Sequence, residues 1–434
     1  MNLVTTTDQL SGKIAQSIQE QKDVSSDKIR SSAFEAFLQT GIPHAKHEEY
    51  KHTPIARYLD KNFTFTPSAA AGPIGSVEEF FIPGLESNRV VFIDGVFSKE
   101  HSNLDSTQVR ISKLEEALPS GNEIAAQNFA RYADFKTDGL TAWNTASWNN
   151  GVFIHVADKA IIDKPIAIYH IINGTAGEMI VNNRNLIVVG KSAQVTIIEK
   201  YDSKGKANHF SNFVNEFVVN ENAGLEYYTI QNDSNNRFQH ARTQIHQKNS
   251  SRVNTYTFTL QGKFYRNNLN LVLDGEGIES HMYGLYLLSN ETSGDNHTVV
   301  DHMKPNSFSN ELYKGIMDGN SKGVFNGKIF VRPQAQKTNA FQANRNILLS
   351  DKAQVNTKPQ LEIWADDVKC SHGCTTGQID EEALFYLQSR GINKETALAM
   401  MLYAFAGEVI DHVPNPVMKE FLDAVISDRL HKNF

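Results

Sequence analysis

Short apolar runs, separated by turn-like segments at a regular interval, are the feature that most constrains the fold of this chain. Between about Thr141 and Gly377 the runs are rich in Val, Ile, Tyr, Phe and Thr, which favour strands, and no convincing helical pattern interrupts them. A small residue precedes an apolar one in the turn-like segments, at steps of about 26 to 30 residues that shorten to about 15 to 18 near the end. The residues that mark these steps are Ala193, Ala223, Ser251, Gly277, Ser307, Ala335, Ala353 and Val368.

Such a series of strands predicts a β-solenoid. A β-sandwich would normally close after fewer residues, and the crossover helices of an α/β sheet are missing from the pattern. In a solenoid each rung buries apolar side chains against the next, and asparagine and small residues suit the tight corners. The open ends must be covered, and helical ends do that. We therefore expect a mainly β fold, in which a β-helix core is capped by helices.

The same change of texture divides the 434 residues into three regions. We expect a helical region with some strand at 1–140, the β-helix core at 141–377 and a helical domain at 378–434. Leu10 and Ile14, four residues apart, begin the helical pattern of the first region. The chain is long enough for two or three domains with at least one large core.

The C-terminal region predicts three helices. Asp380 is a suitable N-cap for the first of them and Gly391 a suitable C-terminal stop. The middle helix carries apolar side chains over more than one face. Either it is buried in a small bundle of its own, or part of its surface binds a partner, for which Met401 and Phe405 are our candidates.

Charge and apolar content exclude several classes of protein. The formal net charge is -7, which argues against a nucleic-acid-binding protein because such proteins need basic surface to displace counterions from phosphates. No segment approaches the roughly 18 apolar residues that a membrane span needs. The first residues do not resemble a secretory signal, and two cysteines argue against a disulfide scaffold. We therefore expect a cytoplasmic protein without nucleic-acid or membrane partners.

Motifs of the common catalytic classes are missing from the sequence. The segment "GKS" at 190–192 lacks the first glycine of a phosphate-binding loop, and neither H-E-x-x-H nor G-x-S-x-G occurs. The pair Asp366–Asp367 would suit a β-helix polysaccharide lyase or hydrolase, but neighbours on a strand point to opposite faces. We expect no catalysis by this chain alone, and we keep this enzyme class as an alternative function.

Both cysteines lie in one five-residue window with a histidine midway between them: Cys370, His372 and Cys374. On an extended strand the three side chains project to one face, and the cysteine Cα atoms lie roughly 13 Å apart, too far for a disulfide. Two thiolates on one zinc lie only about 4 Å apart, so a zinc-binding structural protein is a weaker alternative. Thiolate and imidazole also suit iron–sulfur chemistry, provided that another chain supplies further ligands. The spacing alone leaves a structural role equally open.

The sequence around this window resembles the SufB/SufD family of iron–sulfur cluster assembly proteins. The stretch 356–392, "NTKPQLEIWADDVKCSHGCTTGQIDEEALFYLQSRGI", is similar to the family signature, and its details resemble the SufD branch. The resemblance extends to "WNTASWNNGVFIHV", "PIAIYHI" and "FNGKIFVRPQAQKTNAFQANRNILLS". It is looser in "FLQTGIPHAKHEEYKHT", where Tyr50 stands in place of the usual tryptophan. It covers essentially the whole chain.

This resemblance implies a right-handed parallel β-helix core flanked by N-terminal and C-terminal helical domains. It implies an assembly scaffold that pairs with SufB through the β-helices and binds a SufC ATPase through the C-terminal helices. It also implies that the histidine of "CSHG", here His372, acts with a cysteine of SufB as a ligand of a transient iron–sulfur cluster. Cys370 is a weaker candidate ligand.

Three expectations around this resemblance stay open. A small residue is usual where this chain has Cys374, so the extra thiol is a spare ligand, a sulfur acceptor or an inert filler of a small site. Complexes of this type are linked to a reduced flavin, although no flavin-binding motif is visible in the sequence. For the isolated chain we keep both a monomer and a homodimer open.

Overall fold

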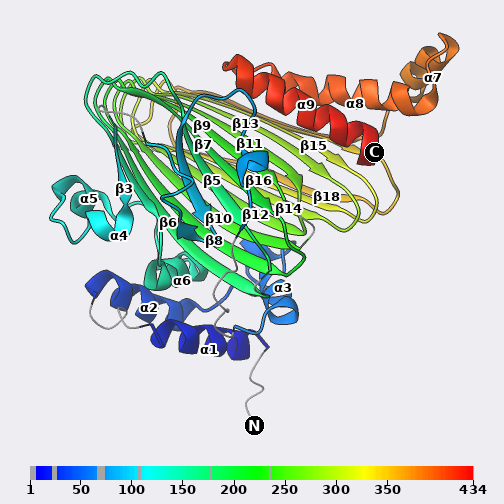
Figure 1. Ribbon diagram of the computed structural model, residues 1–434. Coiled ribbons are helices and arrows are strands. Elements are labelled where there is room, and N and C mark those ends of the chain that lie inside the picture. Colours follow the sequence, from blue (N-terminus) through cyan, green and yellow to red (C-terminus); the bar gives the residue numbers. More distant parts are fainter. Residues whose placement is uncertain are drawn as a thin grey trace.

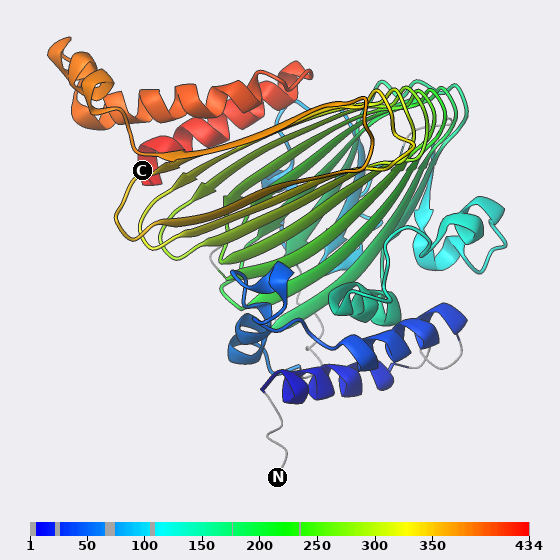
Figure 2. The ribbon, with the colours of Figure 1, turned by 180° about the vertical axis from the view of Figure 1, so that it is seen from behind.

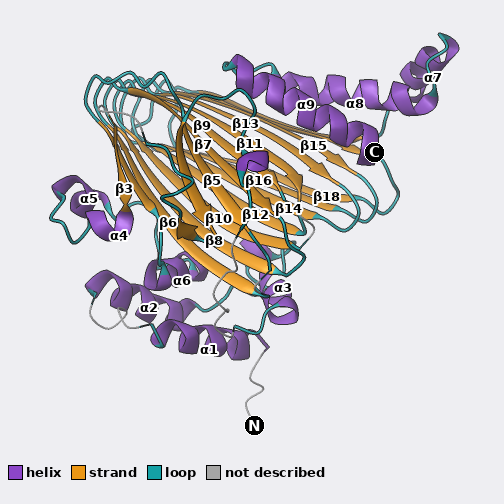
Figure 3. Cartoon of the chain, viewed as in Figure 1, coloured by secondary structure: helices purple, strands orange, loops and turns teal. Residues whose placement is uncertain are grey.

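The computed structural model describes residues 6–21, 27–65, 74–104, 109–175, 177–233 and 236–433. Its centre is a solenoid of two stacked β-sheets with helices on the outer faces (Figures 1 and 3). The ten-stranded sheet contains β1 (Asn88–Ile93), β2 (Val96–Phe97), β5 (Ile166–Ile172), β7 (Gln194–Ser203), β9 (Gly224–Asn232), β11 (Arg252–Gln261), β13 (Glu279–Leu288), β15 (Phe308–Met317), β17 (Asn339–Leu348) and β19 (Lys369–Gly377).

The nine-stranded sheet and the helices complete the described chain. The sheet contains β3 (Val109–Lys113), β4 (Val152–Val156), β6 (Met179–Val189), β8 (His209–Val219), β10 (Arg237–Gln247), β12 (Phe264–Leu273), β14 (Ser293–His302), β16 (Lys322–Val331) and β18 (Gln354–Ile363). The α-helices are α1 (Thr6–Gln19), α2 (Lys28–Thr40), α3 (Ile55–Asn62), α4 (Leu114–Ala117), α5 (Glu123–Asn128), α6 (Gly139–Ser147), α7 (Glu381–Ser389), α8 (Lys394–Ile410) and α9 (Pro416–Asn433). Two 3-10 turns are η1 (Glu48–Tyr50) and η2 (Glu78–Phe80).

Successive strands alternate between the two sheets, so each pass of the chain adds one strand to each sheet. From β5 and β6 onward, every strand pairs in parallel with the strand two places later, up to β18 and β19. The antiparallel pairs β1–β2 and β3–β4 lie at the opposite end of the sheets. This arrangement confirms the predicted mainly β, parallel solenoid with helical regions before and after it.

The corners between rungs explain the periodic small and polar residues of the sequence. Ser192, Asn222 and Ser250 occupy equivalent turns, and their φ values of 56°, 59° and 55° lie in the left-handed region. Asparagine tolerates this region better than most residues do. The turns also stack, because the amide of Ser192 donates to the carbonyl of Glu221 and that of Asn222 to the carbonyl of Asn249, both at 2.9 Å. Each turn is thus bonded to the next, which fixes the interval of the repeat.

The space between the two sheets holds the main core. Its apolar cluster includes Ile154, Ile166, Ile168, Ile187, Ile197, Phe217, Leu271, Phe325 and Ile329. Burial of each such side chain stabilises the fold by about 1.5–3 kcal/mol. Polar groups are buried here too: Glu199 accepts hydrogen bonds from the hydroxyls of Tyr201 and Tyr227 and from Asn185 Nδ2, at 2.7 to 2.9 Å. These donors offset the cost of burying the carboxylate.

Helices cover the outer face of each sheet (Figures 1 and 2). Tyr58 of α3 packs against Phe238 and Phe264 of the nine-stranded sheet, and Trp143 of α6 stacks on Phe210. Helices α1 and α2 pack in turn on α6. Helices α8 and α9 pack on the ten-stranded sheet, where Leu402 and Met418 join its outward-facing apolar side chains. The predicted middle helix, α8, packs both against its neighbouring helices α7 and α9 and against the outer face of the solenoid. None of the helices in the described part of the chain is long and apolar enough to cross a membrane.

Candidate functional site

The last strand of the solenoid, β19, carries both cysteines and the histidine between them. It forms the edge of the ten-stranded sheet, where its hydrogen-bonded neighbour is β17. Strand β18 has the same position in the nine-stranded sheet, beside β16. Figure 2 shows these last strands at the end of the solenoid that carries the C-terminal helices. This end therefore presents two strand edges that no described residue pairs.

The three side chains of the window share one face of β19. Cys370 lies beside Ala340 of β17 and packs against the apolar cluster between the sheets. His372 lies beside Gln342, which is buried. Because side chains alternate along a strand, Cys370, His372 and Cys374 all face the interior side of the last rung. No further rung covers them, so His372 and Cys374 are exposed and Cys370 is half-buried.

The two thiols differ in their readiness to bind a metal. Both are free, and the extended strand holds their Cα atoms about 13 Å apart, too far for a disulfide. Burial raises the pKa of the Cys370 thiol. The thiolate is the form that binds metals, so the raised pKa makes Cys370 a weaker ligand than an ordinary cysteine.

This strand cannot surround a metal ion with its own side chains. Successive members of the window lie about 6.6 Å apart along the strand, whereas two ligands of one zinc or iron ion lie about 4 Å apart. Among the residues that the structure describes, no group of three or more His, Cys, Asp and Glu side chains could hold a metal ion. The window can present an imidazole and a thiol to something that docks on the open end.

The acidic pair that motivated the enzyme alternative lies elsewhere than we expected. Asp366 and Asp367 occupy a bend between β18 and β19, not a strand, so the argument from opposite strand faces was wrong. The bend is fixed by the amide of Asp367, which donates to Gln336 Oε1 at 2.9 Å, and by its carbonyl, which accepts from the amide of Lys337. Both carboxylates are exposed. The feature that they share with a glycoside hydrolase site is that two carboxylates lie close together in the chain.

The two candidate partner-binding residues on α8 have different surroundings. Met401 is partly exposed. Phe405 packs against the outer face of the ten-stranded sheet. The ammonium of Lys314 lies 4.2 Å from the centroid of the Phe405 ring and donates to the Phe405 carbonyl at 2.8 Å. Phe405 therefore fastens α8 to β15, and Met401 lies nearer to solvent.

Sequence reasoning missed the most exposed apolar side chains of this region. Phe385 and Tyr386 on α7 are 72% and 56% exposed, and Met400 on α8 is 48% exposed. Tyr403, one turn further along α8, is 36% exposed. We call these four residues the α7–α8 surface. The run "ALFYLQ" was the available signal, because it places two large aromatic residues side by side on a short helix.

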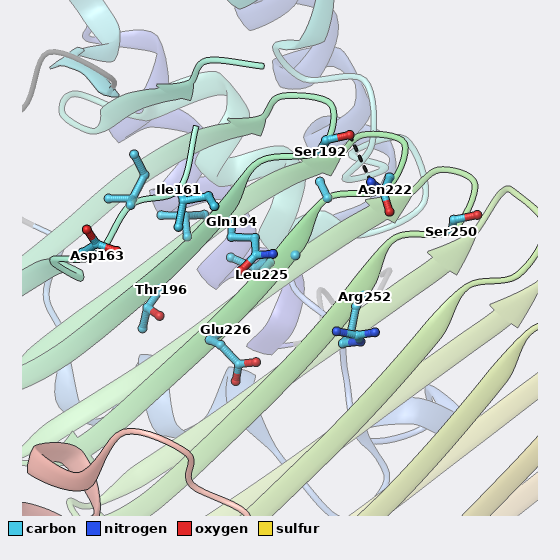
Figure 4. Close-up of a pocket in the computed structure, with 14 residues that line it drawn as sticks. Ile161, Asp163, Ser192, Gln194, Thr196, Asn222, Leu225, Glu226, Ser250 and Arg252 are labelled. Carbon is cyan, nitrogen blue, oxygen red and sulfur yellow. Dashed lines mark hydrogen bonds between the residues drawn. The ribbon is translucent and has the colours of Figure 1, made fainter. Parts of the chain in front are cut away.

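A hollow of about 400 Å³ opens on the ten-stranded sheet far from the window (Figure 4). It lies over β7, β9 and β11, which β13, β15 and β17 separate from β19. Glu226 at its edge accepts a hydrogen bond from Asn254 Nδ2 at 2.6 Å, and burial raises the pKa of the Glu226 carboxyl. Asn222 Nδ2 donates to Ser192 Oγ at 3.1 Å on the opposite side. The hollow shares no residue with the Cys–His–Cys window.

Comparisons with known proteins give one family for both parts of the chain. The family model described as "SUF system FeS cluster assembly, SufBD core domain" matches residues 170–405, and the "SufBD protein N-terminal region" model matches residues 3–168.

Individual relatives agree with the family models. The chain is 33% identical to an iron–sulfur cluster assembly SufBD family protein of Synechocystis, over 89% of this chain and 87% of the relative. It is 32% identical to the iron–sulfur cluster assembly protein SufD of Escherichia coli, over 91% of this chain and 90% of the relative. It is 30% identical to SufD of Bacillus subtilis over 67% of each chain. The chain therefore belongs to the SufBD family of iron–sulfur cluster assembly proteins, and it is SufD-like.

Proposed function

We propose that this chain is a non-enzymatic scaffold subunit, in which His372 supplies one ligand to a nascent iron–sulfur cluster. The observation that carries the proposal is the place of this imidazole. It is exposed on the interior side of the last rung, and it makes no hydrogen bond to the described residues. Imidazole nitrogen binds the iron of some iron–sulfur clusters, and an exposed ring is free to do so.

The remaining ligands come from a partner that covers the open end. Unpaired strand edges bind other strands readily, and those of β18 and β19 suit a second β-helix. Phe341, Ile363 and Trp364 lie at this end and are 38%, 39% and 48% exposed, which adds apolar surface to the edges. We propose that a SufB chain pairs here and brings a cysteine to the cluster. In isolation, a second copy of this chain is expected to occupy the same edges.

The two cysteines of this chain have secondary roles in the proposal. Cys374 is exposed and faces the same side as His372, so it is placed to accept sulfur or to act as a spare ligand. Cys370 is half-buried in the apolar cluster and serves mainly as packing. The two free thiols also suit a reducing compartment, and we infer that the protein works in the cytoplasm. The reduced flavin that the resemblance implies stays a prediction for the assembled complex.

We propose that a SufC ATPase docks on the α7–α8 surface, next to Met401. Exposed aromatic and methionine side chains are typical of protein-binding surfaces. Helix α8 is fastened to the sheet by Glu408, which pairs with Lys314 of β15 and with Arg345 of β17, the latter at 3.0 Å. Because β17 is the hydrogen-bonded neighbour of β19, we expect a movement of α8 to be transmitted through β17 to the strand that carries His372. ATP hydrolysis itself belongs to the SufC subunit.

Anaerobic reconstitution with SufB and SufC, followed by iron and sulfide analysis, tests the function. We expect His372→Ala to fold normally and to lose cluster formation, whereas Cys370→Ala and Cys374→Ala retain it. Ser371→Ala is the matched control, because Ser371 is exposed on the opposite face of the same strand. Normal cluster yield from His372→Ala would refute the assignment of the ligand.

A further inference from the structure

One column of side chains in the ten-stranded sheet changes from apolar to polar as it approaches the open end. Its last three members, Glu311, Gln342 and His372, are paired in register on β15, β17 and β19. A buried carboxylate and a buried amide are costly in a core unless they are hydrogen-bonded. In strand order from β7 to β19, the whole column is Ile197, Tyr227, Thr255, Met282, Glu311, Gln342 and His372.

The amide of Gln342 is hydrogen-bonded through its nitrogen, and its oxygen is left without a partner among the described residues. The side chain is 3% exposed, and its Nε2 donates to Glu311 Oε2 at 2.7 Å. Gly327 of β16 makes room for the amide, because a Cβ atom at that glycine would lie 2.3 Å from Gln342 Nε2. The carbonyl oxygen, Oε1, is buried and accepts no hydrogen bond from the described residues. An unused buried acceptor is rare in folded proteins.

The next inward-facing amide of β17 differs from Gln342 in that both of its polar atoms are hydrogen-bonded. Asn344 lies two residues after Gln342 and beside Cys374. Its Nδ2 donates to the hydroxyl of Tyr286 at 3.0 Å, and its Oδ1 accepts from Asn346 Nδ2 at 2.7 Å. Of these two buried amides of β17, the one beside His372 keeps an unused oxygen, whereas the one beside Cys374 does not.

We propose that Gln342 is a positioning residue for His372, whose Nδ1–H donates to Gln342 Oε1. Adjacent strands lie about 4.8 Å apart, so rotation of the exposed ring brings Nδ1 within reach. Glu311 fixes the direction of the amide by accepting from its NH2 group, and Nε2 of the imidazole keeps its lone pair for iron. Histidine ligands commonly donate their other ring N–H to a carbonyl in this way. The ligand role of Nε2 rests on the proposed function, but the hydrogen bond does not.

Nitrogen NMR on the full-length chain with 15N-labelled histidine tests the hydrogen bond directly. The chain has 15 histidines, and the signal that disappears in His372→Ala identifies the relevant ring. At a pH of about 8.5 an ordinary imidazole is neutral, so the ratio of the two tautomers can be measured. We expect Gln342→Met to lower the Nδ1–H to Nε2–H ratio about fivefold, the equivalent of about 1 kcal/mol for one hydrogen bond. An unchanged ratio would overturn the proposal.

Three further variants separate positioning from packing. Gln360→Met makes the same chemical change on β18. Leu361 packs into the core, so its neighbour Gln360 faces outward, and this variant should leave the tautomer ratio of His372 unchanged. Gly327→Ala should reproduce the effect of Gln342→Met, because the added Cβ displaces the amide. The double variant Glu311→Gln with Gln342→Glu exchanges donor and acceptor but still offers an oxygen to His372. We expect this exchange to restore the Nδ1–H tautomer, which a pure packing role would not require.

Reconstitution with SufB and SufC then separates this inference from the proposed function. We expect Gln342→Met to reduce cluster yield about tenfold, within the usual effect of removing a group that orients a metal ligand. If the tautomer ratio shifts in Gln342→Met while His372→Ala still forms clusters, the hydrogen bond is correct and the ligand assignment is wrong. If His372→Ala loses clusters while Gln342→Met changes neither ratio nor yield, the function stands and the inference about Gln342 is wrong.

Discussion

Replacing Glu311 by glutamine should remove a large pH dependence from the stability of this chain. Glu311 is 1% exposed, and burial raises the pKa of its carboxyl from 4.5 to about 7. Because the pKa is higher in the folded chain, ionisation favours unfolding. The cost is absent below about pH 4.5, grows as the pH rises, and becomes constant above about pH 7. The difference between these two pKa values corresponds to about 3 kcal/mol of unfolding free energy.

Urea unfolding of the wild type and of Glu311→Gln between about pH 5 and about pH 8.5 measures this effect. Other titrating groups are common to both proteins, so they cancel in the difference between the two curves. We expect the variant to gain up to about 3 kcal/mol over the wild type on the alkaline side, relative to the acidic side. The matched control is Glu276→Gln, because Glu276 is exposed and should give parallel curves. Parallel curves for Glu311→Gln as well would refute the reasoning.

Two other perturbations test the fold and the proposed ATPase surface. Glu216→Gln should lower the free energy of unfolding in urea by about 3–5 kcal/mol. The reason is that Glu216 is buried, pairs with Arg184 at 2.7 Å and accepts hydrogen bonds from three backbone amides. Glu221→Gln, at an exposed ion pair, should lower it by less than about 1 kcal/mol. Similar costs for both would contradict this account. Changing Phe385 and Tyr386 together to serine should weaken SufC binding by about 30-fold in calorimetry, with unfolding free energy within about 0.5 kcal/mol of the wild type. Unchanged binding would exclude these residues from the interface.

The solenoid could be predicted from the sequence because its corners recur in the chain itself. Residues such as Asn222 and Ser250 sit in equivalent turns with positive φ, so the spacing of small and polar residues reports the length of a rung. The alternation of strands between two sheets was not visible, since paired residues such as Gln194 and Gly224 lie a full rung apart. The bend at Asp366 was read as strand because the run of strands continues on both sides of it.

The candidate site could be predicted only where its members are neighbours in the chain. Cys370, His372 and Cys374 fall on one strand, so the period-two rule was enough to place them on one face. Glu311 and Gln342 lie 31 residues apart and become neighbours only through the parallel register. Helix α8 gave an ambiguous pattern for a physical reason: it packs on the sheet along one side and leaves apolar side chains exposed along another.

The unequal ends of the solenoid limit how many chains can join along its axis. At one end the short β2 and the antiparallel β3 terminate the two sheets, and short or reversed strands are poor acceptors of further strands. At the other end β18 and β19 leave parallel edges unpaired by the described residues. A molecule with unpaired strand edges at one end only can pair once, because the edges that have joined are no longer available to a third chain. If chains join through these edges as proposed, assembly along the axis would stop at two chains and would not continue into fibres.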